Sequence, residues 1–159
     1  MNLHIMPAKS FLKLNVSPEH SAAIISTSSD IDEARISCPY ILAEYMDFDY
    51  ESPRSFSTEQ ASAFASFVKE LNRNTTDLYI CCDAGESRSP AIAAAIHRWL
   101  AQNDAYIWET AKYHPNMFCF LRMLDALNLS ITDEEVDALI QTNQSAFKNA
   151  VQQARLGGL

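Results

Sequence analysis

The residues best suited to chemistry lie in one short segment, Cys82 to Ser89, which reads Cys-Asp-Ala-Gly-Glu-Ser-Arg-Ser. Five residues separate Cys82 from Arg88, and Ser89 follows the arginine directly. Gly85 lies within the segment, whereas the other two of the chain's three glycines lie at the C-terminal end. A thiol, a guanidinium and a hydroxyl at this spacing can hold a phosphate dianion and attack it with sulfur.

The backbone of this segment also suits an anion. Amide N–H groups at a helix N-terminus form an anion site that the helix dipole favours, and the flexible Gly85 lets the loop close around it. The same positive field favours the thiolate form of Cys82, which is the nucleophilic form. The residues expected to bind phosphate are Asp83, Ala84, Gly85, Glu86, Ser87 and Arg88.

The side chains at the end of the segment have separate expected roles. Arg88 carries a permanent charge, and its planar guanidinium can hold two phosphate oxygens at once. Ser89 can donate its hydroxyl to the sulfur as it leaves a phosphocysteine intermediate. Ser87 is expected to brace the loop. Cys82, Arg88 and Ser89 are therefore candidate catalytic residues.

The neighbouring sequence predicts the elements that position this segment. Residues 77–81 form a short, strand-like run, and residues 90–100 form an Ala-rich run with helical character. Pro90 has the fixed φ that suits a first helical turn. A strand, a tight loop and a helix in this order would place the thiol at the start of the helix.

The segment resembles the signature loop of cysteine-dependent protein phosphatases, and the small dual-specificity branch fits best. That branch has the pattern C-x-A-G-x-S-R-S, which is matched here by Cys82, Ala84, Gly85, Ser87, Arg88 and Ser89. The likeness extends from about Ile41 to Leu129. It implies phosphoester hydrolysis through a phosphocysteine at Cys82, without a cofactor, on a phosphotyrosine protein phosphatase-like fold.

The resemblance also implies an aspartate general acid about thirty residues before the cysteine, because the leaving oxygen needs a proton. Asp47 and Asp49 both lie in that region. Asp49 is the first choice, because it is nearer the loop that ends at Ser57 and because strand alternation would turn Asp47 toward an apolar face. Either residue could instead be a solvated loop aspartate.

Two positions near the loop are expected to support it. Pro115-Asn116 resembles a Pro-Asn pair that buttresses the phosphate loop in the family, although Asn116 could equally be a simple helix-start residue. Cys81 stands where the family usually has a histidine. The adjacent Cys81-Cys82 pair raises a redox interpretation. Because adjacent cysteines bridge only with strain, inert packing is the expected role of Cys81.

Charge narrows the expected substrate. The chain has 20 acidic and 12 basic residues, with a formal net charge of −8. Asp83 and Glu86 are expected to weaken the positive field of the loop, which argues against substrates with several phosphates. The acidic balance also disfavours nucleic acid and acidic membrane surfaces. A phosphorylated protein is the expected partner, with phosphotyrosine favoured and phosphoserine or phosphothreonine possible.

Two other function classes stay open at this point. The first is a phosphate-binding pseudophosphatase, whose intact loop would hold phosphoprotein partners without turnover. The second is a thiol redox enzyme of the arsenate reductase type, in which Cys81 would resolve an oxidised Cys82. Phosphate release from phosphopeptides would separate both from a phosphatase.

Length and composition predict one domain over residues 1–159. We expect no membrane span and no signal peptide, and hence a cytoplasmic location. The cysteines do not suggest a disulfide framework, and the histidines lack ligand spacing, so no metal is expected. Oligomeric state is left open. The cysteines are Cys38, Cys81, Cys82 and Cys119, and the histidines are His4, His20, His97 and His114.

The wider pattern predicts an α/β fold with a central, mostly parallel sheet flanked by helices, and with Cys82 at the C-terminal end of a central strand. Strands are predicted over residues 12–16, 22–26, 40–46 and 77–81. Helices are predicted over 57–73, 90–102, 106–113, 115–127 and 132–156, the first and last opened by capping boxes. The last helix is expected to close the domain, with a partner surface as the alternative. A set of aromatic residues is expected in the core: Tyr106, Trp108, Tyr113, Phe118 and Phe120.

Overall fold

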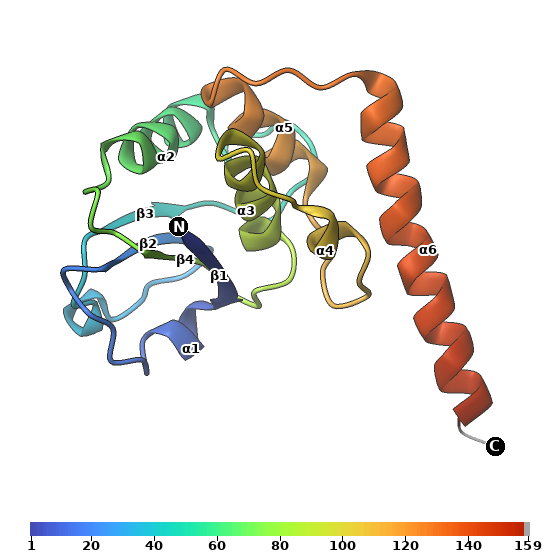
Figure 1. Ribbon diagram of the computed structural model, residues 1–159, viewed down its shortest axis with the longest axis horizontal. Coiled ribbons are helices and arrows are strands. Elements are labelled where there is room, and N and C mark those ends of the chain that lie inside the picture. The colour runs from blue at the N-terminus through green and yellow to red at the C-terminus, as the bar shows by residue number, and fades with distance from the viewer. Residues whose placement is uncertain (158–159) are drawn as a thin grey trace.

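A parallel β-sheet of four strands forms the central layer (Figure 1). The computed structural model describes residues 1–157, so 158–159 of the expected domain lie outside the described residues. The strand order is β1-β4-β2-β3, and β4 pairs with β1 and β2. The strands are β1 (Asn2–Pro7), β2 (Ser21–Thr27), β3 (Tyr40–Glu44) and β4 (Asp77–Cys82). The predicted α/β architecture is confirmed, and Cys82 ends an inner strand.

The inner strands are buried on both faces. All seven residues of β2 are buried, which is typical of a parallel strand covered by helices or loops on each side. The sheet separates two hydrophobic core clusters, a larger one beneath α2, α3 and α5 and a smaller one beside α1. Alternate side chains of β2 enter different clusters: Ile24 lies in the larger and Ile25 in the smaller. Ile80 and Cys81 of β4 divide in the same way. Cys81 therefore packs on the side of the sheet that α1 covers, and not on the side that α3 covers.

Helices cover both faces of the sheet. Figure 1 shows α2, α3 and α5 on one face and the short α1 on the other. A further 3-10 turn, Glu33–Arg35, precedes β3. The helices are α1 (Ala8–Phe11), α2 (Thr58–Glu70), α3 (Arg88–Trp99), α4 (Ala105–Trp108), α5 (Met117–Ala126) and α6 (Asp133–Gly157).

Small side chains let α3 approach the sheet closely. Four alanines of α3 have no exposed surface, and they pack in the larger core cluster with Ile92 and Ile96. Close packing of this kind holds the first turn of α3 rigidly against the end of β4. The four alanines are Ala91, Ala93, Ala94 and Ala95.

Both predicted capping boxes are present. The Ser57 hydroxyl accepts a hydrogen bond from the Gln60 amide, and the Gln60 side chain accepts one from the Ser57 amide. Thr132 and Glu135 make the same reciprocal pair before α6. Because each pair satisfies two backbone donors that a helix start leaves free, the sequence located these helix starts correctly.

The strand predicted over residues 12–16 is not formed, so that prediction is wrong. These residues follow α1 as a turn and open chain, and the Leu14 side chain is 43% exposed. The missing strand is β1, which lies at the sheet edge beside β4. Its residues are mostly only partly buried, so they lack the continuous apolar run that reveals an inner strand.

Several other predicted elements are shorter in the structure, among them α2, which ends at Glu70 rather than at residue 73. The helix predicted over 106–113 is reduced to α4, and the carbonyls of Trp108, Thr110 and Tyr113 accept hydrogen bonds from the Asn143 side-chain amide. β3 ends at Glu44 rather than at residue 46. Of the aromatic residues expected in the core, Trp108, Tyr113 and Phe120 are buried, whereas Tyr106 is 47% exposed.

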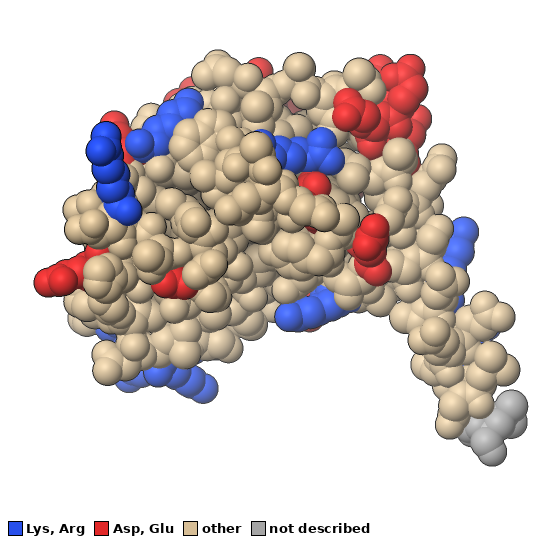
Figure 2. All heavy atoms as spheres, in the orientation of Figure 1, with Lys and Arg blue, Asp and Glu red and all other residues tan. Residues whose placement is uncertain are grey.

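The long helix α6 packs on the side of the domain, next to α4 (Figure 1). None of its described residues is buried, and its contacts are few: Leu139 touches the core, Asn143 binds three carbonyls and Phe147 packs on His114 at 3.8 Å between ring centroids. Acidic side chains gather over its first turn (Figure 2). Among residues 1–157, we find no helix with the length and apolarity that crossing a bilayer requires.

Asn143 is the main polar anchor of α6, which allows a direct test. Replacing it with alanine (Asn143→Ala) removes bonds to three carbonyls, so the free energy of unfolding should fall by about 1–3 kcal/mol in urea titration. The exposed Asn149 on the same helix is the matched control, and Asn149→Ala should change stability by less than about 0.5 kcal/mol. Equal effects of the two variants would contradict this anchoring.

Candidate active site

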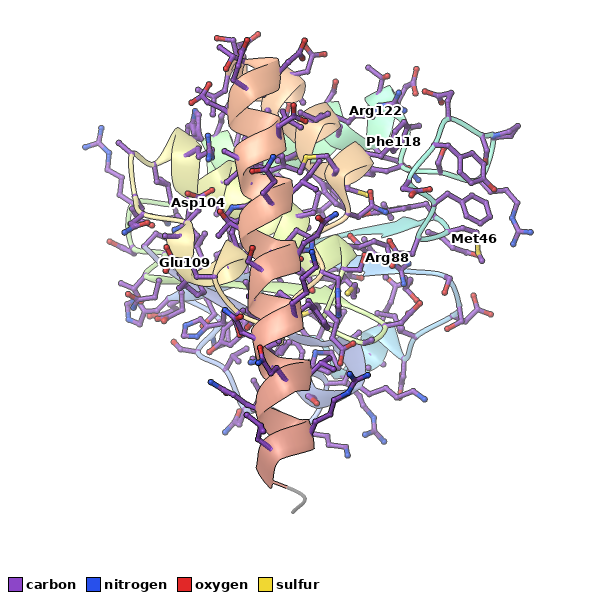
Figure 3. All side chains as sticks on the ribbon, turned by 90° about the vertical axis from the view of Figure 1, so that its right-hand side faces the viewer. Met46, Arg88, Asp104, Glu109, Phe118 and Arg122 are labelled. Carbon is purple, nitrogen blue, oxygen red and sulfur yellow. The ribbon has the colours of Figure 1, made fainter. Side chains whose placement is uncertain are left out.

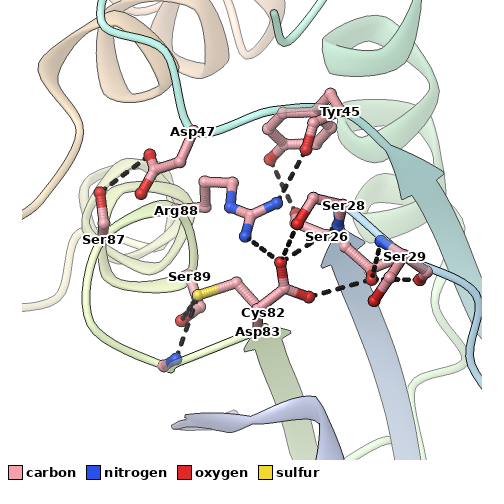
Figure 4. Close-up of polar contacts among 12 residues, drawn as sticks. Ser26, Ser28, Ser29, Tyr45, Asp47, Cys82, Asp83, Ser87, Arg88 and Ser89 are labelled. Carbon is pink, nitrogen blue, oxygen red and sulfur yellow. Dashed lines mark hydrogen bonds and ion pairs between the residues drawn. The ribbon is translucent and has the colours of Figure 1, made fainter. Parts of the chain in front are cut away.

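The loop between β4 and α3 brings the predicted thiol and hydroxyl together (Figure 4). Cys82 is 2% exposed, and its Sγ accepts a hydrogen bond from the Gly85 amide at 3.2 Å. The same sulfur lies 3.1 Å from the Ser89 hydroxyl. Because both groups can donate, they would stabilise negative charge on the sulfur.

Gly85 is required by both its conformation and its surroundings. Its φ of 73° lies in the left-handed region, where side chains with a Cβ are strained. An added Cβ would lie 2.6 Å from the Pro7 nitrogen and 2.7 Å from the Met6 carbonyl carbon. The backbone where β1 passes into α1 therefore supports the loop from behind.

In the backbone of this loop, two carbonyls accept hydrogen bonds from other parts of the chain, whereas three amides have no hydrogen-bond partner within residues 1–157. The Glu86 carbonyl accepts from the His114 amide at 2.7 Å, and the Ser87 carbonyl accepts from the Asn116 amide at 3.2 Å. Within residues 1–157, the amides of Ala84, Glu86 and Ser87 make no hydrogen bond. Free amides before the first turn of a helix are suited to binding an anion.

Arg88 is the buried charge of the site. The residue is 4% exposed, with Nη1 donating to the Tyr45 carbonyl at 2.8 Å and Nη2 donating to the Asp83 carboxylate at 2.6 Å. Its Nε is buried and has no partner in the described chain. Burial disfavours the charged form, but the Asp83 carboxylate outweighs this effect and raises the pKa of Arg88.

Asp83 is bound from the opposite side by residues at the end of β2. Its carboxylate accepts from the Thr27 hydroxyl at 3.0 Å, from the Ser28 amide at 3.2 Å and from the Ser28 hydroxyl. Burial opposes ionisation, but the bonds from Ser28 and Arg88 outweigh it and lower the pKa of Asp83 to about 2. Sequence reasoning missed the bonds from Thr27 and Ser28, because those residues lie far from Asp83 in the chain. Glu86, the other acid of the loop, is exposed.

Asp47, and not Asp49, is held against the loop between β4 and α3. Its carboxylate accepts from the Ser87 hydroxyl at 3.0 Å and from the Asn116 side-chain amide at 2.7 Å. Asp49 is exposed, and in the described chain its side chain makes no hydrogen bond. The argument that favoured Asp49 assumed that strand alternation continues to residue 47, but β3 ends at Glu44.

Asn116 joins three parts of the site. Its side-chain amide donates to Asp47 and to the Phe48 carbonyl, and its Oδ1 accepts from the Cys119 amide at 2.9 Å. The last bond caps α5, so the helix-start role and the loop-supporting position occur together. Asn116 therefore fixes the Asp47 segment relative to the loop between β4 and α3.

The rest of the segment that carries Asp47 is also tied to α5. Arg122 donates to the Phe56 carbonyl at 2.7 Å and pairs with the Glu51 carboxylate. Its guanidinium carbon lies 4.4 Å from the centre of the Phe118 ring, and Figure 3 shows these two side chains together. These contacts restrict the chain between β3 and α2.

The remaining thiols near the site are packing groups. Cys81 has no exposed surface and lies in the core cluster of Phe11 and Ile25, on the α1 side of the sheet. Burial raises the pKa of the Cys81 thiol, and it raises that of Cys119 to about 12. All four cysteines are free. In the part of the chain that the structure describes, we find no cluster of three or more metal-ligating side chains.

We compared the chain with family models, curated proteins and solved structures, and nothing matched.

Gly85→Ala tests how closely the loop depends on its glycine. The variant would strain a left-handed backbone and force the loop away from Pro7, so we expect a loss of at least about 1–3 kcal/mol in the free energy of unfolding. The control is Gly157→Ala, where an added Cβ meets nothing within 4 Å. Wild-type stability of Gly85→Ala in urea titration would contradict the close approach.

Proposed function

We propose that this protein is a cysteine-dependent phosphatase that hydrolyses phosphomonoesters on proteins, with a protein tyrosine phosphatase-like fold of the dual-specificity type. The observation that carries the proposal is the convergence of three groups on one loop: the Cys82 sulfur, the free loop amides and the unpartnered Nε of buried Arg88. Together they supply a nucleophile and donors for the oxygens of a phosphoryl group.

In the first step, the Cys82 thiolate attacks the phosphorus, and an S–P bond forms as the ester P–O bond breaks. Arg88 and the loop amides hold the three non-bridging oxygens. The leaving oxygen takes a proton from the Asp47 carboxyl group, which lies beside the loop at Ser87. The products are the free hydroxyl of the substrate and a phosphocysteine.

In the second step, water attacks the phosphocysteine and gives its proton to the Asp47 carboxylate. The S–P bond breaks, and the electron pair returns to sulfur as thiolate. The Ser89 hydroxyl and the Gly85 amide, at 3.1 Å and 3.2 Å from the sulfur, stabilise that departing charge. Inorganic phosphate leaves, and no step requires a cofactor.

The proposed substrate is a phosphorylated protein, with phosphotyrosine favoured over phosphoserine and phosphothreonine. The net charge of −8 and the acidic residues of the loop weaken attraction for nucleic acid and acidic membranes. We also propose a cytoplasmic location, because the four free cysteines suit a reducing compartment.

A non-catalytic phosphate-binding module is the second candidate. The observation that favours it is the Arg88–Asp83 ion pair, which already occupies one nitrogen of the guanidinium. The two functions differ in turnover. A binding module would retain phosphopeptide without releasing phosphate, whereas the phosphatase releases it under reducing conditions without metal.

The nucleophile and its charge partner are tested by phosphate release from phosphotyrosine and phosphoserine peptides. Cys82→Ser should abolish turnover, and Arg88→Lys should reduce it by at least about a hundredfold, because lysine cannot hold two oxygens in one plane. Arg35→Lys, at an exposed arginine, is the matched control and should leave the rate unchanged. Full activity in Cys82→Ser would exclude the proposed nucleophile.

The two aspartates form a natural pair of variants. Asp47→Asn should lower kcat about a hundredfold on phosphoserine peptides, whose leaving group needs a proton, and much less on p-nitrophenyl phosphate. Asp49→Asn should behave as wild type. The reverse pattern of kcat values would move the acid role to Asp49.

A further inference from the structure

We infer that Asp83 is a positioning residue, which fixes the guanidinium of Arg88 so that its free edge faces the sulfur of Cys82. This inference rests on the phosphatase function proposed above and assigns a role to the first variable position of its loop. It replaces the expectation that Asp83 acts only by weakening the positive field.

The first argument comes from the donors that Arg88 has used and those that it has left. A guanidinium carries five N–H donors, of which Nε–H and one Nη2 hydrogen form an edge that can bind two oxygens. Tyr45 binds Nη1 and Asp83 binds Nη2, while Nε is buried without a partner. In Figure 4 the acceptors from Tyr45 and Asp83 lie to the right of the guanidinium, and the Cys82 sulfur lies below and to the left.

The second argument is that Asp83 is itself held in place. The Thr27 hydroxyl and two groups of Ser28 bind its carboxylate, and these residues stand at the end of β2. A carboxylate with this many donors stays ionised at any working pH and keeps a fixed orientation. The rigid sheet is thus connected through Asp83 to the side chain that would hold the phosphoryl group.

A competing role for Asp83 would be to imitate the phosphate and block Arg88. A blocking carboxylate should fill the place of the substrate and pair with Nε, which is the donor that an oxyanion would use. Asp83 leaves that donor free although only 5% of the Arg88 side chain is exposed. The contact pattern therefore fits a support behind the guanidinium.

The test measures inorganic phosphate as a competitive inhibitor of p-nitrophenyl phosphate hydrolysis. Asp83→Ala should raise the inhibition constant about tenfold or more, the usual effect of a lost charged hydrogen bond. Asp83→Asn, which is nearly isosteric and keeps one acceptor oxygen, should raise it several-fold and carries the test if the alanine variant does not fold. Both should lower kcat/KM.

Asp30→Asn is the charge-matched control, because Asp30 lines the same surface pocket as Asp83, is exposed and makes no hydrogen bond within residues 1–157. The Asp30→Asn variant should bind phosphate as tightly as the wild type or slightly more tightly. If Asp83 acts through Arg88, the double variant Arg88→Lys/Asp83→Ala should bind phosphate no more weakly than Arg88→Lys alone. A general structural defect caused by Asp83→Ala would instead weaken phosphate binding further in the double variant.

Phosphate binding in both Asp83 variants that equals or exceeds the wild type would overturn the inference and make Asp83 a blocking group. An equal loss in Asp30→Asn would overturn it as well, because charge alone would then explain the effect. If the wild-type protein neither binds phosphate nor hydrolyses esters, the proposed function fails and this inference fails with it.

Discussion

The most demanding group in this structure is the guanidinium of Arg88, a permanent charge in a residue that is 4% exposed. A charge can be buried only where opposite charge and hydrogen-bond acceptors replace the lost water. Asp83 and the Tyr45 carbonyl do this for two of its nitrogens, and they directly follow the C-terminal ends of two parallel strands, β4 and β3. The third nitrogen, Nε, has no partner in the described chain. The arrangement of the site follows from balancing this one charge.

The surrounding fold sets the geometry of the loop before any substrate arrives. Gly85 lies against the backbone at Met6 and Pro7, while residues 114–116 bind the carbonyls on the other side of the loop. Asn116 then links this support to Asp47 and to the start of α5. Because the donors are already oriented, a bound phosphoryl group would require little rearrangement, and such preorganisation is the main source of electrostatic catalysis.

Local chemistry could be predicted from the sequence, and long-range chemistry could not. The order of β4, loop and α3, and the capping boxes at Ser57 and Thr132, depend on residues close together in the chain. The edge strand β1 was not predicted, because its partly buried residues do not form the continuous apolar run of an inner strand. The partners of Asp83 and Asp47 depend on the fold, since Ser28 and Asn116 lie 55 and 69 residues away. No local pattern encodes such contacts, so the choice between two nearby aspartates needed the structure.

Trapping a phosphocysteine at Cys82 would test the proposed mechanism at its first step. Wild-type protein would be mixed with a phosphotyrosine peptide, quenched within one turnover, digested and examined by mass spectrometry. The proposed mechanism predicts the added mass of one phosphoryl group on the fragment that holds Cys82, and no such mass in Cys82→Ser. Release of phosphate by the wild type with no labelled cysteine, or with the label on another residue, would contradict the central role of this thiol.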